Sequence, residues 1–171
     1  MGGNKFLTAA EIAAYRRGGY VIPELRLSAP RVAELGGAVE YVVEANPHVP
    51  PEALVSVHIV DNKAENRRGH RAFLDPALDC HLLDLVEQII GPDIILWGCH
   101  LFCKPGATGH EVPWHQGRYF WPFRPLATCT PWLALDEVNS ENGCMRVIPG
   151  SHAARTLYRH HADNRSGAGA L

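Results

Sequence analysis

The chain has 171 residues, of which 46% are hydrophobic and 20% charged, with a formal net charge of −2. This length predicts one domain, and no apolar run approaches the ~18 residues that a membrane span needs. The near balance of 16 basic and 18 acidic residues, without a basic stripe, argues against non-specific binding to nucleic acid.

Helices are predicted in the first ninety residues. Thr8 and Glu11 have the capping-box spacing, and a Gly-Gly pair ends the segment that they begin. Residues 28–47 place apolar side chains at helical spacing, and residues 75–93 repeat the pattern. Residues 1–92 are therefore expected to be mainly helical.

After residue 92 the pattern changes to short β-branched or aromatic segments. These segments are DIILWGCHLFCKP, VPWH, ATCTPWLALDEV and GCMRVIPGSH. Turns rich in Gly, Pro and Asn separate them, which is typical of strands. Helices followed by strands indicate an α+β or mainly β protein, in which helices brace an antiparallel barrel or jelly roll.

The number of strands is low for such a fold. A jelly roll needs about eight strands, and fewer are recognisable before Leu171. Either strands come from the N-terminal part, for example residues 52–61, or the sequence stops inside its domain, and we favour the second alternative. We therefore predict one incomplete domain over residues 1–171, in which 93–171 are core strands and the C-terminal strands are missing. Such a chain is expected to be marginally stable and inactive, because open sheet edges favour aggregation.

The cysteines predict a reducing compartment. Their number is odd and no CxxC pair occurs, and they lie mostly in apolar surroundings, where a free thiol behaves as a small hydrophobe. The N-terminus lacks the layout of a secretory signal. We therefore predict a cytoplasmic protein. The five cysteines are Cys80, Cys99, Cys103, Cys129 and Cys144.

His115 lies in the run VPWHQGRYFWPF, residues 112–123. Residues i and i+2 of a strand share a face, so a His-x-Asp pair would direct an imidazole and a carboxylate at one metal ion. Non-haem Fe(II) sites commonly use two histidines and one carboxylate, but here Gly117 takes the carboxylate position. The residues alone leave open a metal site that lacks a ligand, a site altered to hold another group, or a strand end with a core histidine.

Two longer stretches carry a family resemblance. They are KPGATGHEVPWHQ, residues 104–116, and RPLATCTPWLALDEVNSENGCMRVIPGSH, residues 124–152. Together they closely resemble the phytanoyl-CoA dioxygenase family of Fe(II)/2-oxoglutarate-dependent oxygenases. The resemblance is dense over residues 94–161, and the run ENGCMRVIPGSH is specific.

The resemblance implies a double-stranded β-helix, a cupin-like jelly roll, and an oxidoreductase. Such an enzyme uses Fe(II), 2-oxoglutarate and O2 to hydroxylate an unactivated C–H bond of a small organic substrate. By this resemblance His115 is the first iron ligand, and Lys104 and Trp132 lie near 2-oxoglutarate. The implied partner is a small molecule, with no nucleic acid and no membrane.

The resemblance also places two further groups well after the P-G-S-H motif. These are the second iron-binding histidine and the arginine that binds 2-oxoglutarate. His160 and His161 come too early for the histidine, and Arg165 has no matching context. Both groups are therefore expected to be absent from this chain.

Gly117 departs from the family pattern. Either Gly replaces the family's Asp directly, or the Asp is deleted and Gly117 matches the glycine that follows it; both alternatives leave no carboxylate. Related halogenases have Ala or Gly at this position and bind chloride there. The alternatives are therefore a hydroxylase, a halogenase that uses the Gly117 vacancy, or a non-catalytic β-barrel module.

Overall fold

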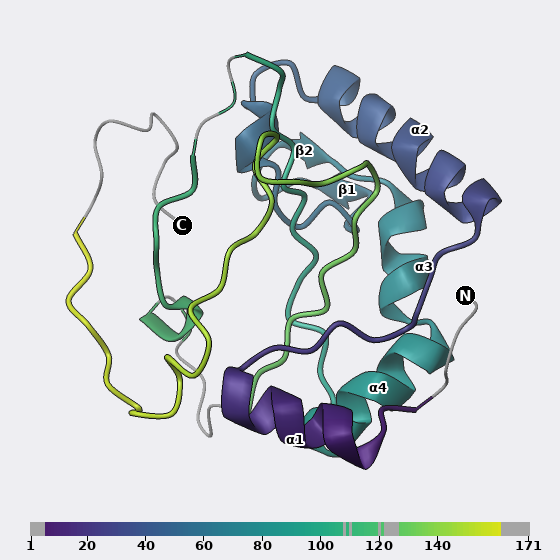
Figure 1. The fold of residues 1–171 in the computed structure, drawn as a ribbon. Coiled ribbons are helices and arrows are strands. Elements are labelled where there is room, and N and C mark those ends of the chain that lie inside the picture. The colour runs from purple at the N-terminus through teal and green to yellow at the C-terminus, as the bar shows by residue number, and fades with distance from the viewer. Residues whose placement is uncertain (1–5, 108, 110, 120, 122–126, 162–171) are drawn as a thin grey trace.

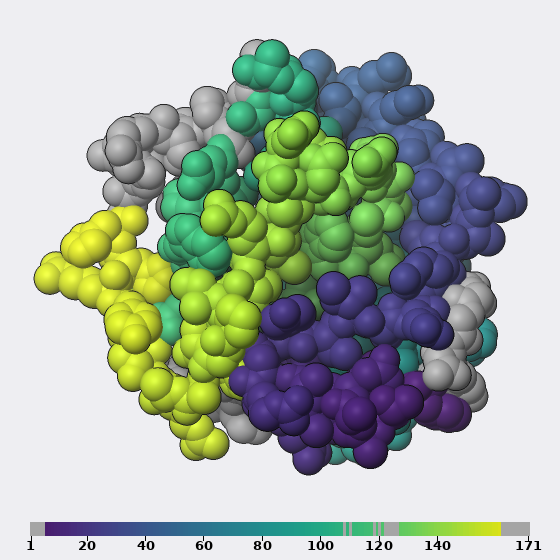
Figure 2. All heavy atoms as spheres, viewed as in Figure 1, coloured from purple at the N-terminus to yellow at the C-terminus, as the bar shows by residue number. Residues whose placement is uncertain are grey.

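The computed structural model describes residues 6–107, 109, 111–119, 121 and 127–161. The helices lie along one side of the molecule, and the irregular second half of the chain forms the other side (Figure 1). In the space-filling view, residues of the second half occupy the middle of the visible face, beside the N-terminal helices (Figure 2). The helices are α1 (Ala9–Gly18), α2 (Ala29–Ala45), α3 (Leu74–Ala77) and α4 (Cys80–Ile90), with 3-10 turns η1 (Pro51–Ala53), η2 (Arg71–Phe73) and η3 (Gly117–Tyr119).

The ends of α1 confirm the sequence prediction. The Thr8 hydroxyl accepts a hydrogen bond from the Glu11 amide, and the Glu11 carboxylate accepts one from the Thr8 amide at 2.7 Å. The hydrogen bonds that the Thr8 amide and hydroxyl donate to the Glu11 carboxylate lower the pKa of Glu11. Gly19 ends the helix in the left-handed conformation, at φ 84°, which glycine adopts without a steric penalty.

The hydrophobic core lies under α2. This helix buries Leu35, Ala38 and Val42, which pack in two clusters with residues of the loops that follow. Leu54 is 1% exposed and Val42 is fully buried. The helix begins at the predicted position, directly after Ser28.

Asn46 joins α2 to a small antiparallel hairpin of β1 (Asp61–Asn62) and β2 (Arg67–Arg68). Its amide group donates to the Val42 and Arg68 carbonyls, both at 2.7 Å, and accepts from the Arg68 amide at 2.8 Å. A buried amide without these partners would carry a desolvation penalty. Asn46 therefore fixes the hairpin against the end of the helix.

The segment predicted as one helix over residues 75–93 forms two helices. Asp79 interrupts it and caps α4, since its carboxylate accepts a hydrogen bond from the His81 amide at 2.9 Å. Leu82, Leu85 and Val86 are the buried residues of α4. None of the helices in the described ranges is long and apolar enough to cross a membrane.

The predicted core strands of residues 93–171 are not formed in the part of that segment that the structure describes. In these described residues, the one strand-like pairing is an isolated antiparallel bridge between Val55 and His100. Beside it, the Leu101 amide donates to the Leu54 carbonyl at 3.2 Å. The structure is a mixed helical protein with a two-stranded sheet, and it does not show the double-stranded β-helix. The physical reason is that a strand needs a neighbour to satisfy its backbone.

The P-G-S-H motif docks on α1. The Gly150 amide donates to the Gly18 carbonyl at 2.9 Å, and His152 Nε2 donates to the Arg16 carbonyl at 3.0 Å. These carbonyls belong to the last turn of α1, which lacks intrahelical partners. His152 therefore fixes the loop on α1.

Candidate metal and cofactor site

His115 lies in the segment that leads into η3, with its side chain exposed. Its Nδ1–H donates to the Pro113 carbonyl at 2.9 Å. This bond selects the tautomer in which Nε2 carries the lone pair. Metal-ligating histidines commonly have their other ring nitrogen held in this way, so the local geometry suits a ligand.

Gln116 ties the His115 segment to a distant part of the chain. Its side-chain amide donates to the Thr156 carbonyl and accepts from the Tyr158 amide, both at 2.8 Å. Its backbone amide donates to His160 Nε2 at 2.9 Å. The amide side chain thus pairs with the backbone of residues 156–158 much as a neighbouring strand would, and it fixes the position of the residue next to His115.

His160 completes this contact. Its ring stacks on Tyr119 with centroids 4.3 Å apart, and its Nδ1–H donates to the Tyr158 carbonyl at 2.9 Å. Nε2 already accepts from Gln116. Both ring nitrogens are engaged, so in this arrangement His160 offers no lone pair to a metal ion.

Gly117, which the sequence predicts at the carboxylate position, begins η3 and packs against Trp121. An ideal Cβ on Gly117 would lie 3.2 Å from Cη2 of the Trp121 ring. The position therefore lacks a carboxylate and is not an open space. Sequence reasoning missed Trp121, because an aromatic residue in an apolar run is typical of a core.

Lys104 and Trp132, the predicted 2-oxoglutarate neighbours, lie on separate segments. Lys104 extends along the turn of residues 139–143, with Nζ 3.5 Å from the Gly143 carbonyl. Gly143 has φ 88°, and a Cβ there would lie 3.0 Å from Lys104 Nζ. Trp132 is 39% exposed. Their contact with 2-oxoglutarate stays a prediction.

The segment before Lys104 holds three partly buried side chains with shifted pKa values, Cys99, His100 and Cys103. Burial lowers the pKa of His100 and raises the pKa of Cys99. Burial, and then the charges of Glu52 and Asp136, raise the pKa of Cys103. His100 also stacks on Phe102, with ring centroids 4.3 Å apart, which indicates a packing role.

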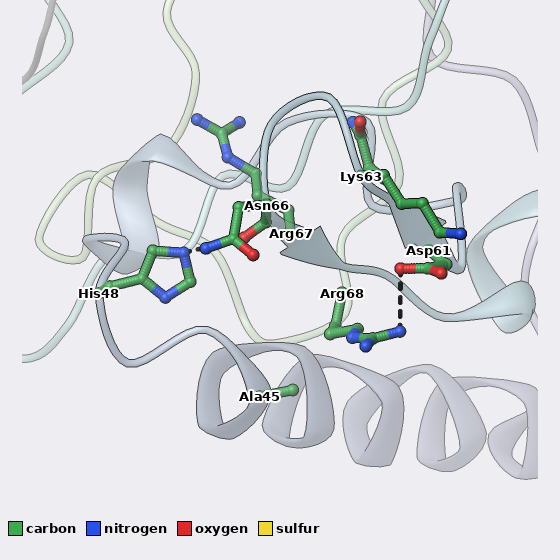
Figure 3. Close-up of a pocket in the computed structure, with 8 residues that line it drawn as sticks. Ala45, His48, Asp61, Lys63, Asn66, Arg67 and Arg68 are labelled. Carbon is green, nitrogen blue, oxygen red and sulfur yellow. Dashed lines mark hydrogen bonds and ion pairs between the residues drawn. The ribbon is translucent and has the colours of Figure 1, made fainter.

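Two cavities lie apart from these residues. One, of about 310 Å³, lies between the end of α2 and the β1–β2 hairpin (Figure 3). Its arginines are paired, Arg68 with Asp61 at 2.9 Å and Arg67 with Glu65 at 3.0 Å. The other, of about 590 Å³, is a groove between α1 and the P-G-S-H loop. Neither cavity is lined by His115, Gly117, Lys104 or Trp132.

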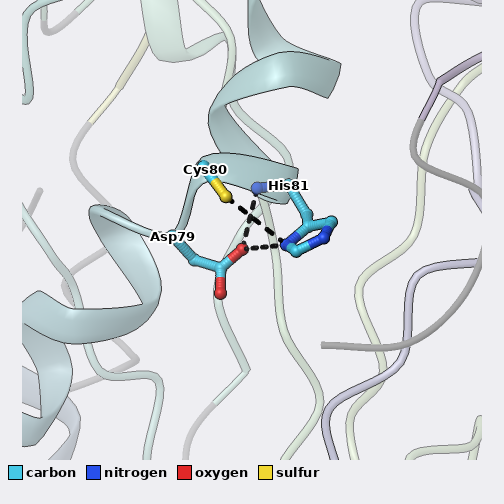
Figure 4. A group of neighbouring side chains, drawn as sticks. All are labelled: Asp79, Cys80 and His81. Carbon is cyan, nitrogen blue, oxygen red and sulfur yellow. Dashed lines mark hydrogen bonds and ion pairs between the residues drawn. The ribbon is translucent and has the colours of Figure 1, made fainter.

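One group of three possible metal ligands occurs in the described residues: Asp79, Cys80 and His81 at the start of α4 (Figure 4). His81 Nδ1 lies 3.2 Å from the Asp79 carboxylate and 3.6 Å from the Cys80 sulfur. Burial favours a higher pKa for Asp79, but the hydrogen bonds from His81 lower it. These contacts cap α4, and we assign the group that role.

The described residues do not fit an Fe(II) site of two histidines and a carboxylate. His115 is the one predicted ligand that they supply, Gly117 has no side chain, and His160 uses both nitrogens. The only three-ligand group within residues 6–107, 109, 111–119, 121 and 127–161 does not include His115.

Comparison with known proteins decides the family. The family model for phytanoyl-CoA dioxygenase (PhyH) matches residues 4–168. The chain belongs to the phytanoyl-CoA dioxygenase family. It is 30% identical over 133 residues to the peroxisomal phytanoyl-CoA dioxygenase of Bos taurus, which covers 74% of this chain and 38% of the relative. No solved structure matches.

Two further relatives of the phytanoyl-CoA dioxygenase family show how widely the similarity extends. A probable phytanoyl-CoA dioxygenase of Caenorhabditis elegans is 27% identical over 165 residues, covering 85% of this chain and 53% of the relative. An ectoine dioxygenase of Sphingopyxis alaskensis is 28% identical over 158 residues, covering 85% of this chain and 50% of the relative. The chain thus spans about half the length, or less, of these three curated relatives.

Proposed function

We propose that this protein is an Fe(II)- and 2-oxoglutarate-dependent dioxygenase that hydroxylates an unactivated C–H bond of a small organic molecule. The observation that carries the proposal is the family match over residues 4–168. The relatives are named as dioxygenases of different compounds. Membership of the family therefore does not identify the substrate, which depends on the pocket residues of this chain.

In this proposal His115 is a metal ligand. Its support is the hydrogen bond from Nδ1–H to the Pro113 carbonyl, which fixes the orientation and the tautomer of the ring. Bound Fe(II) would supply the activation of O2, which protein side chains cannot provide. Lys104 offers a cation for a carboxylate of 2-oxoglutarate, and Trp132 a flat apolar surface beside it.

We further propose that the working enzyme has the jelly-roll fold of its family. The support is the large number of apolar side chains in the second half that face solvent. Ile95 is 89% exposed, Trp97 68% and Ile148 57%. Exposed apolar surface of this extent marks a surface that another element covers, and strand partners would cover these residues.

The test is formation of succinate from 2-oxoglutarate with Fe(II) and O2, together with binding of Fe(II) under anaerobic conditions. We expect both activities to depend on His115 and to be lost in His115→Ala. The matched control is His161→Ala, since His161 is another exposed histidine of this chain, and it should leave both unchanged. Equal succinate formation by native protein and His115→Ala would contradict the proposal.

A second candidate is a binding module that does not turn over. The observation that favours it is Gly117, which supplies no carboxylate. It predicts a protein with neither Fe(II) binding nor succinate formation, and the same two measurements distinguish it from the enzyme.

A further inference from the structure

The groove between α1 and the P-G-S-H loop has two walls that are tied together. Gly18 and Pro149 lie on opposite sides of it. The Gly150 amide donates to the Gly18 carbonyl at 2.9 Å, and His152 Nε2 donates to the Arg16 carbonyl at 3.0 Å. These bonds fix the separation of the walls. The volume of about 590 Å³ lies in the range of about 300–1,000 Å³ that is typical of ligand sites.

The lining of the groove is mainly apolar. Ala14 contributes from α1, Val21 and Ile22 from the segment that follows the helix, and Pro149 from the loop. Ile22 is 78% exposed, and Tyr20, which also lines the groove, is 44% exposed. Contiguous apolar side chains that face solvent are typical of a surface that another molecule covers.

Residues 20–22 also offer free backbone groups. Residues 21–28 alternate between partly buried and exposed, which is the period of an extended segment. Within the part of the chain that the structure describes, the backbone groups of residues 20–22 form no hydrogen bonds. An extended segment with unpaired backbone groups is an edge to which a peptide can add as a strand. Pro23 ends this edge because it has no N–H.

Arg17 gives the groove its charge. It is the one charged residue among the described residues that line the groove, and its side chain is exposed. It forms no ion pair with any residue in the described ranges. An arginine remains charged at any physiological pH and binds carboxylates with two parallel hydrogen bonds. The groove therefore complements a molecule that combines apolar side chains with a carboxylate.

We propose that this groove binds an extended acidic peptide segment of a partner protein. The main chain of the peptide pairs with residues 20–22, an apolar side chain packs against Ile22 and Pro149, and an Asp or Glu side chain pairs with Arg17. The free backbone groups favour a peptide over a small amphiphilic carboxylate, which would leave them unpaired. The proposal does not depend on the oxygenase chemistry.

The test begins with selection from a random heptapeptide library displayed on phage, with the native full chain as the target. We expect enriched sequences to contain apolar residues and at least one Asp or Glu. The strongest binder is then synthesised with a fluorescent label, and its affinity is measured by anisotropy. A selection that yields no acidic peptide whose binding depends on Arg17 would overturn the proposal.

A double-mutant cycle measures the charge pair. Arg17→Gln and replacement of the acidic residue of the peptide by Gln should each weaken binding by roughly two- to fivefold, as for an exposed ion pair, and the two losses should not add. The matched control is Arg16→Gln, since Arg16 is an exposed neighbour in the same turn that does not line the groove. It should change the affinity by less than about twofold. Urea unfolding of each variant checks that it is folded.

Two further comparisons test the apolar and backbone contacts. Ile22→Ser should weaken binding by roughly fivefold or more, whereas Ile95→Ser, at an exposed position outside the groove, should not change it. In an added strand, alternate N–H groups face the partner. N-methylation of alternate residues of the peptide should therefore weaken binding in one register and not in the other.

The remaining outcomes identify a different ligand. Equal binding of both N-methylated peptides, with competition by octanoate, would show a site for a small carboxylate. Binding of phosphatidylglycerol vesicles that requires Arg17 and Ile22, without binding of any peptide, would show a membrane surface. Either result, or equal losses in Arg17→Gln and Arg16→Gln, would overturn the proposal.

Discussion

The two halves of the chain differ in how their apolar residues are covered. In the first half, α2 alone buries Leu35, Ala38 and Val42. In the second half, Ile95 and Ile148 are mostly exposed. A helix satisfies its backbone within one segment and needs only a neighbouring apolar face, whereas a strand also needs backbone partners. The helical half can therefore build its core locally, and the strand-like half cannot.

The largest expected difference between the halves concerns core truncation. Leu54→Ala should lower the free energy of unfolding by about 2–5 kcal/mol, because the side chain is 1% exposed and its loss leaves a cavity. Ile95→Ala, in the second half, should change it by less than about 0.5 kcal/mol, as for other surface positions. Urea titration of both variants measures the difference.

A similar loss of stability in the two variants would break the comparison. It would mean that Ile95 is covered in solution, as the jelly-roll proposal expects of the working enzyme. The two variants therefore show whether Ile95 in the second half is covered by neighbouring strands.

Disturbing a contact between the two halves should change the free energy of unfolding by less than Leu54→Ala does. Gly19 has φ 84°, and a Cβ there would lie 2.8 Å from His152 Nδ1. Gly19→Ala should therefore lower the free energy of unfolding by about 1–2 kcal/mol from the left-handed conformation alone. Gly37→Ala is the matched control, since Gly37 is exposed inside α2 with open space around its Cβ position, and it should raise stability by roughly 0.5–1 kcal/mol.

Thermal or urea unfolding of both glycine variants checks their opposite signs. Adding His152→Ala to Gly19→Ala separates the clash from the backbone strain: only the clash is relieved. If His152→Ala gave no relief to Gly19→Ala, the P-G-S-H loop would not be docked on α1.

Local signals explain which parts of the fold could be predicted from sequence. The Thr8–Glu11 capping box and the stop at Gly19 depend on neighbours within a few residues, and both are confirmed. The interruption at Asp79 was missed, because the apolar spacing runs through it. Asn46 was also missed. Two of its three hydrogen bonds go to Arg68, which lies on another segment, and the third goes to Val42 of its own helix.

The candidate site shows the same limit. His115 and the missing carboxylate at Gly117 were visible as a short pattern, and the family itself was recognised correctly from longer motifs. The pairing of Gln116 with Thr156 and Tyr158 joins positions about forty residues apart, and no spacing rule relates them. The contact of Trp121 with the Gly117 position lies beside a turn, η3, where the sequence suggested a short strand or its end.

The smallest predicted effect is a pH dependence at the bridge between the halves, where His100 faces Val55. Burial lowers the pKa of His100 below its ordinary value of 6.5. Above pH 6.5 the residue is neutral in both folded and unfolded protein. As the pH falls through that value, the unfolded chain takes up the proton first, so stability declines until the lower folded pKa is passed. Burial also lowers the pKa of His58, so this residue too reduces stability as the pH falls.

His100→Phe should therefore reduce the loss of stability between about pH 7 and pH 5 while keeping a ring that stacks on Phe102. Urea unfolding at the two pH values, for native protein, His100→Phe and His58→Phe, measures the share of each histidine. We expect the larger share for His100, because it is more deeply buried than His58. If native protein and His100→Phe lose the same stability on acidification, then His100 is hydrated in the folded protein. In that case the second half is not held against Val55, and the seam between the halves is open in solution.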